Sequence, residues 1–137
     1  MSELAHTRSF GHGPFHRWLG LELLGRSSAA AETRLCVRPE FLQEEGVVQG
    51  GILSALADAT AVYLLMPELA PGASLTSIEF QVHFLRPAQL AAGALHARAD
   101  LVQGGRTLAV CRSVVSQAGE SVAEALLTYL HTARTTR

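Results

Sequence analysis

Apolar residues are arranged in two patterns along the chain, alternation and a continuous run, and each predicts a different kind of secondary structure. In residues 77–86 apolar and polar positions alternate, which is typical of a strand with one face buried. The apolar side holds Ile78, Phe80, Val82 and Phe84, and the polar side holds Ser77, Glu79, Gln81 and His83. Strand patterns also occupy residues 21–24, 29–37, 93–103, 106–116 and 122–132, with turn-forming residues at 25–28, 104–105 and 117–120.

The second pattern is an almost continuous apolar run over residues 52–66, which is rich in helix-forming Ala and Leu. Pro67 ends the run, and Asp58 is the only charged residue between Gly46 and Pro67. A helix that is apolar on nearly every side is buried on most sides, so we expect this helix at the centre of the fold. We also expect a short helix at residues 13–19 and a polar loop at 39–46.

The order of these elements predicts one α+β domain. Two short strands precede the long helix and four strands in a meander follow it, so one helix packs against an antiparallel sheet. A sheet of this size curls around a single helix and leaves edge strands, which small domains commonly cover with a second copy. We assign residues 11–137 to this domain and residues 1–10 to a flexible tail.

Composition narrows the possible functions. The 137 residues carry a net charge of −1, which disfavours nucleic acid and membrane surfaces as partners. Only 17% of the residues are charged, so long disordered arms are not expected. The absence of lysine and asparagine excludes Schiff-base chemistry, a Walker A loop and a Cys-His-Asn triad. Cys36 and Cys111 lie in apolar strand segments and are expected to be reduced and packed. Since no signal peptide is visible and the apolar run is too short to span a bilayer, we expect a cytoplasmic protein.

The candidate chemistry lies on the long helix. A carboxylate at Asp58 is costly to ionise in apolar surroundings, so it is either a structural group hydrogen-bonded to Thr60, Ser54 or a loop amide, or a functional acid, which we favour. Gly50 and Gly51 precede the helix, where unpaired amides and the positive end of the dipole suit a polarised carbonyl. The eight residues between Gly50 and Asp58 span about 12 Å of helix, whereas reacting atoms must approach to about 3–3.5 Å. If both groups act on one carbonyl, they come from different subunits.

Three segments carry a resemblance to a known family. Residues 48–58, VQGGILSALAD, resemble the helix motif of hotdog-fold thioesterases, most closely the phenylacetate-pathway (PaaI-like) acyl-CoA thioesterases. Residues 77–88 and the sequence GRTLA at 105–109 resemble two of that family's strand segments. The resemblance covers about residues 14–133. It implies a hotdog fold, in which a curved antiparallel sheet of five to six strands wraps one long central helix.

The resemblance also implies a function, acyl-CoA thioester hydrolysis, and roles for individual residues. Asp58 matches the carboxylate that acts as nucleophile or as general base for water, and the amide of Gly50 matches the group that polarises the thioester carbonyl. Gln43 matches an Asn or Gln that positions the carbonyl or the water. Ser77 matches a Ser or Thr that orients the attacking water, with Thr76 as the alternative in register.

Other positions are expected to bind the substrate. Gln49 stands where the family usually has His, and it can form hydrogen bonds but does not titrate. We expect Gln49 and Gly51 to contact the substrate, and Arg86 and Arg106 to bind coenzyme A phosphates unless they are merely solvated. The family implies no cofactor, and it works as homodimers or dimers of dimers with shared active sites.

Two other functions remain open at this point. One is a non-catalytic acyl-CoA-binding hotdog protein, although mere binding would not need a buried acid. The other is an acyl-ACP thioesterase or a dehydratase on the same fold. No metal site is expected, because His12 and His16 are separated by Pro14 and no third ligand is evident.

Overall fold

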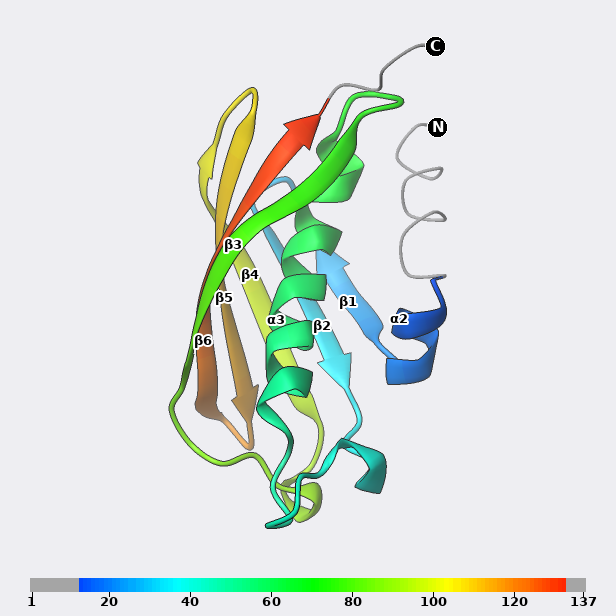
Figure 1. Cartoon of the computed structure of the whole chain (residues 1–137), viewed down its shortest axis with the longest axis vertical. Coiled ribbons are helices and arrows are strands. Elements are labelled where there is room, and N and C mark those ends of the chain that lie inside the picture. Colours follow the sequence, from blue (N-terminus) through cyan, green and yellow to red (C-terminus); the bar gives the residue numbers. More distant parts are fainter. Residues whose placement is uncertain (1–12, 133–137) are drawn as a thin grey trace.

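The computed structural model describes residues 13–132, in which one long helix lies across the inner face of a six-stranded antiparallel sheet (Figure 1). This confirms the predicted α+β class and the central helix. The predicted tail at 1–10 lies outside the described residues. The helices are α2 (Pro14–Leu19) and α3 (Gly50–Leu65), with 3-10 turns η1 (Pro39–Phe41), η2 (Met66–Glu68) and η3 (Leu90–Ala92). The strands are β1 (Glu22–Arg26), β2 (Ala30–Leu35), β3 (Ser74–Phe84), β4 (Leu95–Gly104), β5 (Leu108–Gln117) and β6 (Glu120–Thr132).

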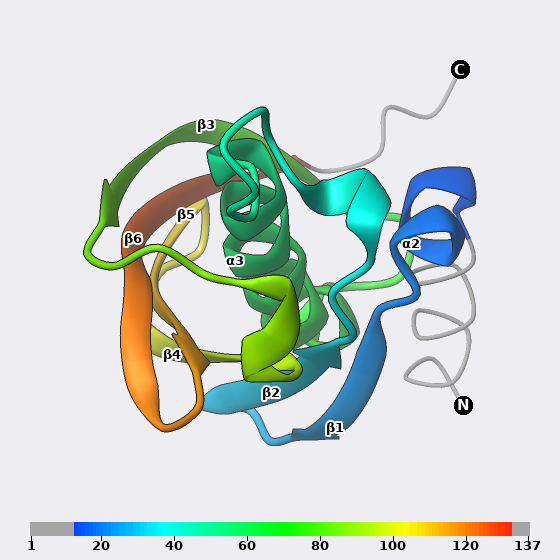
Figure 2. The same ribbon diagram turned by 90° about the horizontal axis from the view of Figure 1, so that it is seen from below.

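The order of the strands differs from the predicted meander. It is β1-β2-β4-β5-β6-β3, so β3 pairs with β6 and not with β4. The connection after β3 crosses the N-terminal end of α3 and delivers β4 to the free side of β2 (Figure 2). Because the sheet curls around the helix, β3 can pair with the side of β6 that β5 leaves free. It remains one edge of the sheet, and β1 is the other.

A bulge in β3 changes which of its side chains share a face. Ser77 pairs with Tyr129 of β6, the next residue, Ile78, is skipped, and pairing resumes at Glu79. An extra residue of this kind shifts the side-chain alternation by one position. Ser77 therefore shares the face of Phe80, and its predicted place on the face of Glu79 is wrong.

The core forms where α3 packs on the inner face of β2, β4, β5 and β6. The helix presents Ala and Leu side chains to the sheet, and short alanines on both sides allow a close approach. The side chains with no exposed area include Leu35, Leu56, Ala61, Leu64, Leu95, Ala99, Cys111 and Val115. This packing fixes the position of the helix relative to every strand except the edges.

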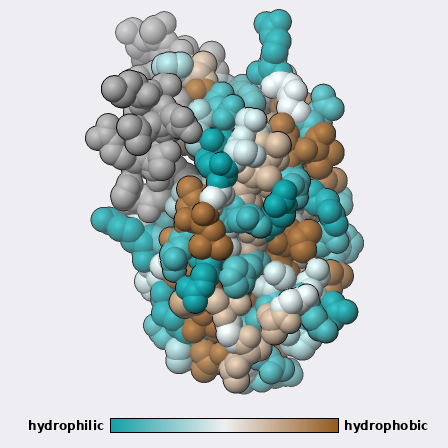
Figure 3. Space-filling view, turned by 180° about the vertical axis from the view of Figure 1, so that it is seen from behind, coloured by the Kyte–Doolittle hydropathy of each residue, from teal (hydrophilic) through white to brown (hydrophobic). Residues whose placement is uncertain are grey.

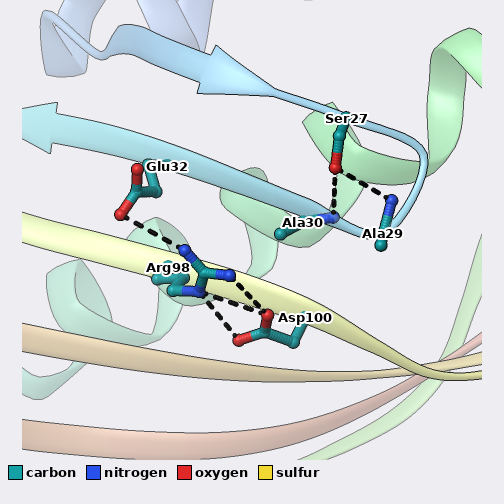
Figure 4. Close-up of polar contacts among 6 residues, drawn as sticks. All are labelled: Ser27, Ala29, Ala30, Glu32, Arg98 and Asp100. Carbon is teal, nitrogen blue, oxygen red and sulfur yellow. Dashed lines mark hydrogen bonds and ion pairs between the residues drawn. The ribbon is translucent and has the colours of Figure 1, made fainter.

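The outer face of the sheet is polar where β2 and β4 adjoin. Arg98 of β4 lies 3.0 Å from Asp100 and 3.6 Å from Glu32 of β2 (Figure 4). In the same view the hydroxyl of Ser27 accepts hydrogen bonds of 3.2 Å from the amides of residues 29–30 and closes the β1–β2 turn. Seen from behind, apolar side chains form separate patches between polar ones (Figure 3). The continuous apolar face is thus the inner one.

Two predictions about single segments need correction. Cys111 is buried as expected, but Cys36 is exposed because β2 ends at Leu35. The apolar helix is also longer than residues 52–66. With η2 it forms a 19-residue stretch, Gly50–Glu68, that by length and composition alone could cross a membrane. Half of that stretch is buried, and the core helix of a soluble protein passes the same test.

A buried pair of hydroxyls joins α3 to β2. Thr60 Oγ1 donates to the carbonyl oxygen of Leu56 at 2.7 Å and lies 2.7 Å from Oγ1 of Thr33. Since the Thr60 proton is engaged with Leu56, Thr33 is the donor between the two hydroxyls. We expect Thr60→Val to leave the Thr33 donor unpaired and to lower the free energy of unfolding by about 1–3 kcal/mol, measured by denaturant unfolding.

The double variant Thr33→Val/Thr60→Val removes both partners and should recover most of that loss. Thr128→Val, at a half-buried position of β6, controls for the hydroxyl-to-methyl exchange and should change stability by less than about 0.5 kcal/mol. A Thr60→Val protein as stable as the wild type would contradict this pairing.

Candidate active site

Asp58 lies in the middle of α3, and a tyrosine of the sheet holds its carboxylate. The Tyr129 hydroxyl donates to Asp58 Oδ1 at 2.7 Å and lies 3.3 Å from the backbone oxygen of Asp58. The Tyr129 side chain is only 1% exposed. Its burial, and next the negative charge of Asp58, raise the pKa of Tyr129 far above its ordinary value. The phenol is therefore held in its protonated form and donates the hydrogen bond to the carboxylate.

The short helix α2 brings a histidine to the same region. The ring of His16 lies 6.4 Å from the ring of Tyr63 of α3. Burial lowers the pKa of His16, and the negative charge of Asp58 partly opposes that shift. The burial of His16 therefore favours its neutral form, and the charge of Asp58 favours the protonated one.

A hollow of about 430 Å³ opens at the N-terminal end of α3. Four residues predicted to act on the substrate line it: Gln43, Gln49, Gly50 and Arg86. Within the described residues, the amides of Gly50 and Gly51 donate to no backbone acceptor. Because these amides lie at the positive end of the helix dipole, the hollow is suited to the oxygen of a polarised carbonyl.

Backbone hydrogen bonds hold the wall of this hollow. The amide of Val48 donates to the Ala88 oxygen at 2.8 Å, and that of Gln49 donates to the Phe41 oxygen at 2.8 Å. The amide of Gln43 donates to the Val47 oxygen at 2.8 Å, and its side-chain oxygen accepts the amide of Glu45. Since this oxygen is engaged, Gln43 can offer the Nε2 hydrogens of its side-chain amide as donors to a carbonyl or a water.

The register of β3 separates the two candidates for the water-orienting hydroxyl. Ser77 is the partner of Tyr129, so the two side chains share the inner face of the sheet. Thr76 is the partner of Leu130 and lies on the opposite face. Ser77 is therefore the hydroxyl beside the Asp58–Tyr129 pair.

The two arginines do not lie together within one chain. Arg86 borders the hollow, where Nη1 donates to the Ser121 oxygen at 2.9 Å and Nε lies 3.3 Å from Glu120. Arg106 lies on the turn between β4 and β5, at the end of the sheet opposite Gly50 (Figure 1). One chain thus offers Arg86 alone at the hollow.

The predicted site residues fall into two groups. Gln43, Gln49, Gly50 and Arg86 gather at the helix N-terminus, while Asp58 and Ser77 lie further along the helix and the sheet. Sequence reasoning missed Tyr129, because it stands 71 residues from Asp58 and no local pattern links them. Within residues 13–132 no three His, Cys, Asp or Glu side chains gather as a metal site would require.

Comparison with known sequences assigns the chain to a protein family. The Thioesterase superfamily profile matches residues 45–124, more than half of the chain, which therefore belongs to that family. The fold is the hotdog fold of thioesterase structures, as the sequence motif predicted. The chain is a thioesterase, and hence a hydrolase.

Particular relatives agree with this assignment. A protein of Ralstonia eutropha JMP134, named as a thioesterase and as phenylacetic acid degradation-related, is 32% identical over 91% of this chain and 98% of its own, with a TM-score of 0.82. A mutant of the phenylacetic acid degradation protein PaaI of Thermus thermophilus is 28% identical over 90% of this chain and 100% of its own, with a TM-score of 0.78. Rv1847 of Mycobacterium tuberculosis H37Rv, named as an esterase, is 28% identical over 68% of this chain and 67% of its own.

The contact between Gly50 and Phe84 gives a test of the hollow's geometry. A Cβ on Gly50 would lie 3.1 Å from Phe84 Cζ, whereas one on Gly51 would lie 3.9 Å from Gln49 Cγ. Ala is favoured over Gly in a helix by up to about 1 kcal/mol. We expect Gly51→Ala to show such a gain in unfolding free energy, and Gly50→Ala to show less because the Phe84 ring must shift.

Adding Phe84→Ala to Gly50→Ala should restore the missing gain, measured against Phe84→Ala alone. Equal gains for the two single glycine variants would mean that the Phe84 ring does not pack on Gly50.

Proposed function

We propose that this thioesterase hydrolyses acyl-CoA to the free acid and coenzyme A, in a site completed by two copies of the chain. The observation that carries the proposal is the presence, on one helix, of an acid at Asp58 and of amides at Gly50 and Gly51 that donate to no backbone acceptor within residues 13–132. An acid and an oxyanion-type donor are the two elements that hydrolysis of a thioester requires.

The two groups cannot meet on one substrate within one chain. About 12 Å of helix separates Gly50 from Asp58, and α3 is continuous between them. A thioester carbonyl bound at the hollow would therefore lie beyond reach of its own chain's carboxylate. The acid must come from a second copy.

The free edge of β3 supports a way to join two copies. It carries exposed apolar side chains, of which Ile78 is 53%, Phe80 44% and Phe84 56% exposed. An unpaired strand with such side chains favours pairing with another strand. If two β3 strands pair antiparallel about a two-fold axis between Phe80 and Gln81, Phe84 of one copy faces Ser77 of the other.

In such a dimer each hollow lies against the Asp58 region of the partner copy. The Gly50 amide and the side-chain NH2 group of Gln43 in one copy hold the thioester oxygen. Ser77 of the other copy orients a water beside Asp58 of that same copy. Asp58 either takes a proton from that water, which adds to the carbonyl carbon, or attacks the carbon itself to form an anhydride that water then opens. In both cases the C–S bond breaks, the thiolate of coenzyme A leaves, and one water is consumed.

The coenzyme A portion of the bound substrate would extend out of the hollow along Arg86. Charge-assisted bonds from Arg86, and from Arg106 across the dimer, suit its phosphates. Gln49 caps no helix amide with its side chain and borders the hollow, which fits a role in shaping the loop. The two free cysteines fit a reducing compartment such as the cytoplasm.

The role of Asp58 is tested by Asp58→Asn, which keeps the volume of the side chain and removes the carboxylate. We expect kcat for acyl-CoA hydrolysis, followed with a thiol-trapping reagent over aryl and straight-chain acyl groups, to fall roughly 10²–10⁴-fold. The melting temperature should not fall, because a half-buried charge disappears. Full activity with a lower melting temperature would make Asp58 a structural residue.

The shared site is tested by co-expressing Asp58→Asn with Gln43→Ala. In a random mixture half of the dimers are hybrid, and each hybrid has one intact site, so about a quarter of wild-type activity should return. A site within one chain predicts no more than the mean of the two parents. Light scattering gives the second measurement, and a fully active monomer would contradict the shared site.

The same substrate screen separates the remaining candidates. Hydrolysis of acyl-ACP in preference to acyl-CoA would move the carrier from coenzyme A to a protein. Tight acyl-CoA binding without turnover would make the chain a binding protein.

A further inference from the structure

We propose that Tyr129 is a positioning residue for Asp58, which holds Oδ1 of the carboxylate so that Oδ2 is the oxygen that reacts. The proposal rests on the proposed function, because it needs Asp58 as the group that attacks the thioester or activates water. It adds a residue to the site and assigns different tasks to the two carboxylate oxygens.

The geometry gives the two oxygens of the carboxylate different hydrogen-bonding environments. The Tyr129 hydroxyl lies 2.7 Å from Oδ1, within the range of a charge-assisted O–H···O bond. Within residues 13–132 no hydrogen bond to Oδ2 is found. A carboxylate has two torsions to fix, and one short bond from a rigid donor restricts both.

The donor itself is rigid. Tyr129 pairs with Ala109 of β5 on one side and with Ser77 of β3 on the other, so both neighbours fix its backbone. Its ring is 1% exposed and packs in the core. Since burial also keeps the phenol protonated, Tyr129 donates a hydrogen bond and cannot serve as the base.

A second hydroxyl from the sheet shows what a purely structural contact looks like here. Ser113 Oγ donates to the backbone oxygen of Ala57 at 2.9 Å, one residue before Asp58. Both Ser113 and Tyr129 fasten α3 to the sheet, but only Tyr129 touches the carboxylate. The pair therefore provides a matched control for helix attachment.

The test compares Tyr129→Phe with Ser113→Ala in steady-state hydrolysis of an acyl-CoA that the wild type turns over. Loss of one hydrogen bond to a charged group should lower kcat of Tyr129→Phe roughly 10-fold to 100-fold. Its KM should stay within about twofold, because substrate binding at the hollow is untouched. Ser113→Ala should lose thermal stability and keep its kcat. Equal effects of the two variants on kcat would overturn the proposal.

A double-variant cycle separates positioning from general damage. In the Asp58→Asn background, Tyr129→Phe should cause no further fall in kcat, since the carboxylate that it positions is gone. A full additional loss would overturn the proposal.

A second variant keeps the question decidable if Tyr129→Phe does not fold. Asp58→Glu retains a carboxylate but places it one methylene further from the helix backbone, so that it no longer matches the fixed position of the Tyr129 hydroxyl, and its kcat should fall at least tenfold at unchanged KM. A fully active Asp58→Glu enzyme would overturn the need for a fixed carboxylate.

The two levels of inference fail in different ways. Wild-type kcat in Asp58→Asn overturns the proposed role of Asp58, and with it the role of Tyr129. A strongly impaired Asp58→Asn together with wild-type kcat in Tyr129→Phe overturns the role of Tyr129 alone.

Discussion

Burial of α3 is the constraint on which the rest of the structure depends. The helix has apolar residues on nearly every side, so the sheet must curl around it to remove them from water. That curvature brings Tyr129 of β6 over the middle of the helix, where Asp58 needs a polar partner. The same packing leaves the first turn at the rim, where the amides of Gly50 and Gly51 donate to no backbone acceptor among the described residues. The burial of this one helix therefore sets the positions of both the Asp58 carboxylate and the Gly50 and Gly51 amides.

A rigid helix also explains why the site residues form two groups. Packing against the sheet prevents α3 from bending, so Gly50 and Asp58 stay about 12 Å apart. The curled sheet ends at β3, whose unpaired edge lies beside both groups, with Phe84 against Gly50 and Ser77 beside Tyr129. One edge strand thus offers a second copy access to both halves, which is why the proposed function needs a dimer.

Side-chain and backbone hydrogen bonds support the hollow in addition to the apolar packing of its wall. The buried side-chain amide of Gln117 donates to the oxygens of Gln89 and Gly93 at 2.7 and 2.8 Å and accepts the Gln89 amide at 2.9 Å. These bonds hold the β3–β4 connection, to which Val48 is tied just before the helix. The loop next to Gly50 is therefore fixed by the Gln117 side chain and by backbone hydrogen bonds, which fits a site that must bind a polar carbonyl without moving.

The helices and strands could be predicted from the sequence, because each depends on the spacing of apolar residues over a short stretch of chain. Residues 52–66 were enough to predict the buried helix, and the helix motif together with two strand segments indicated the family. Strand order, the bulge at Ile78 and the Tyr129–Asp58 bond were decided only by tertiary structure. Each depends on how the sheet closes around the helix, and the residues that then meet are far apart along the chain. Chain-local patterns hold no information about such distant contacts.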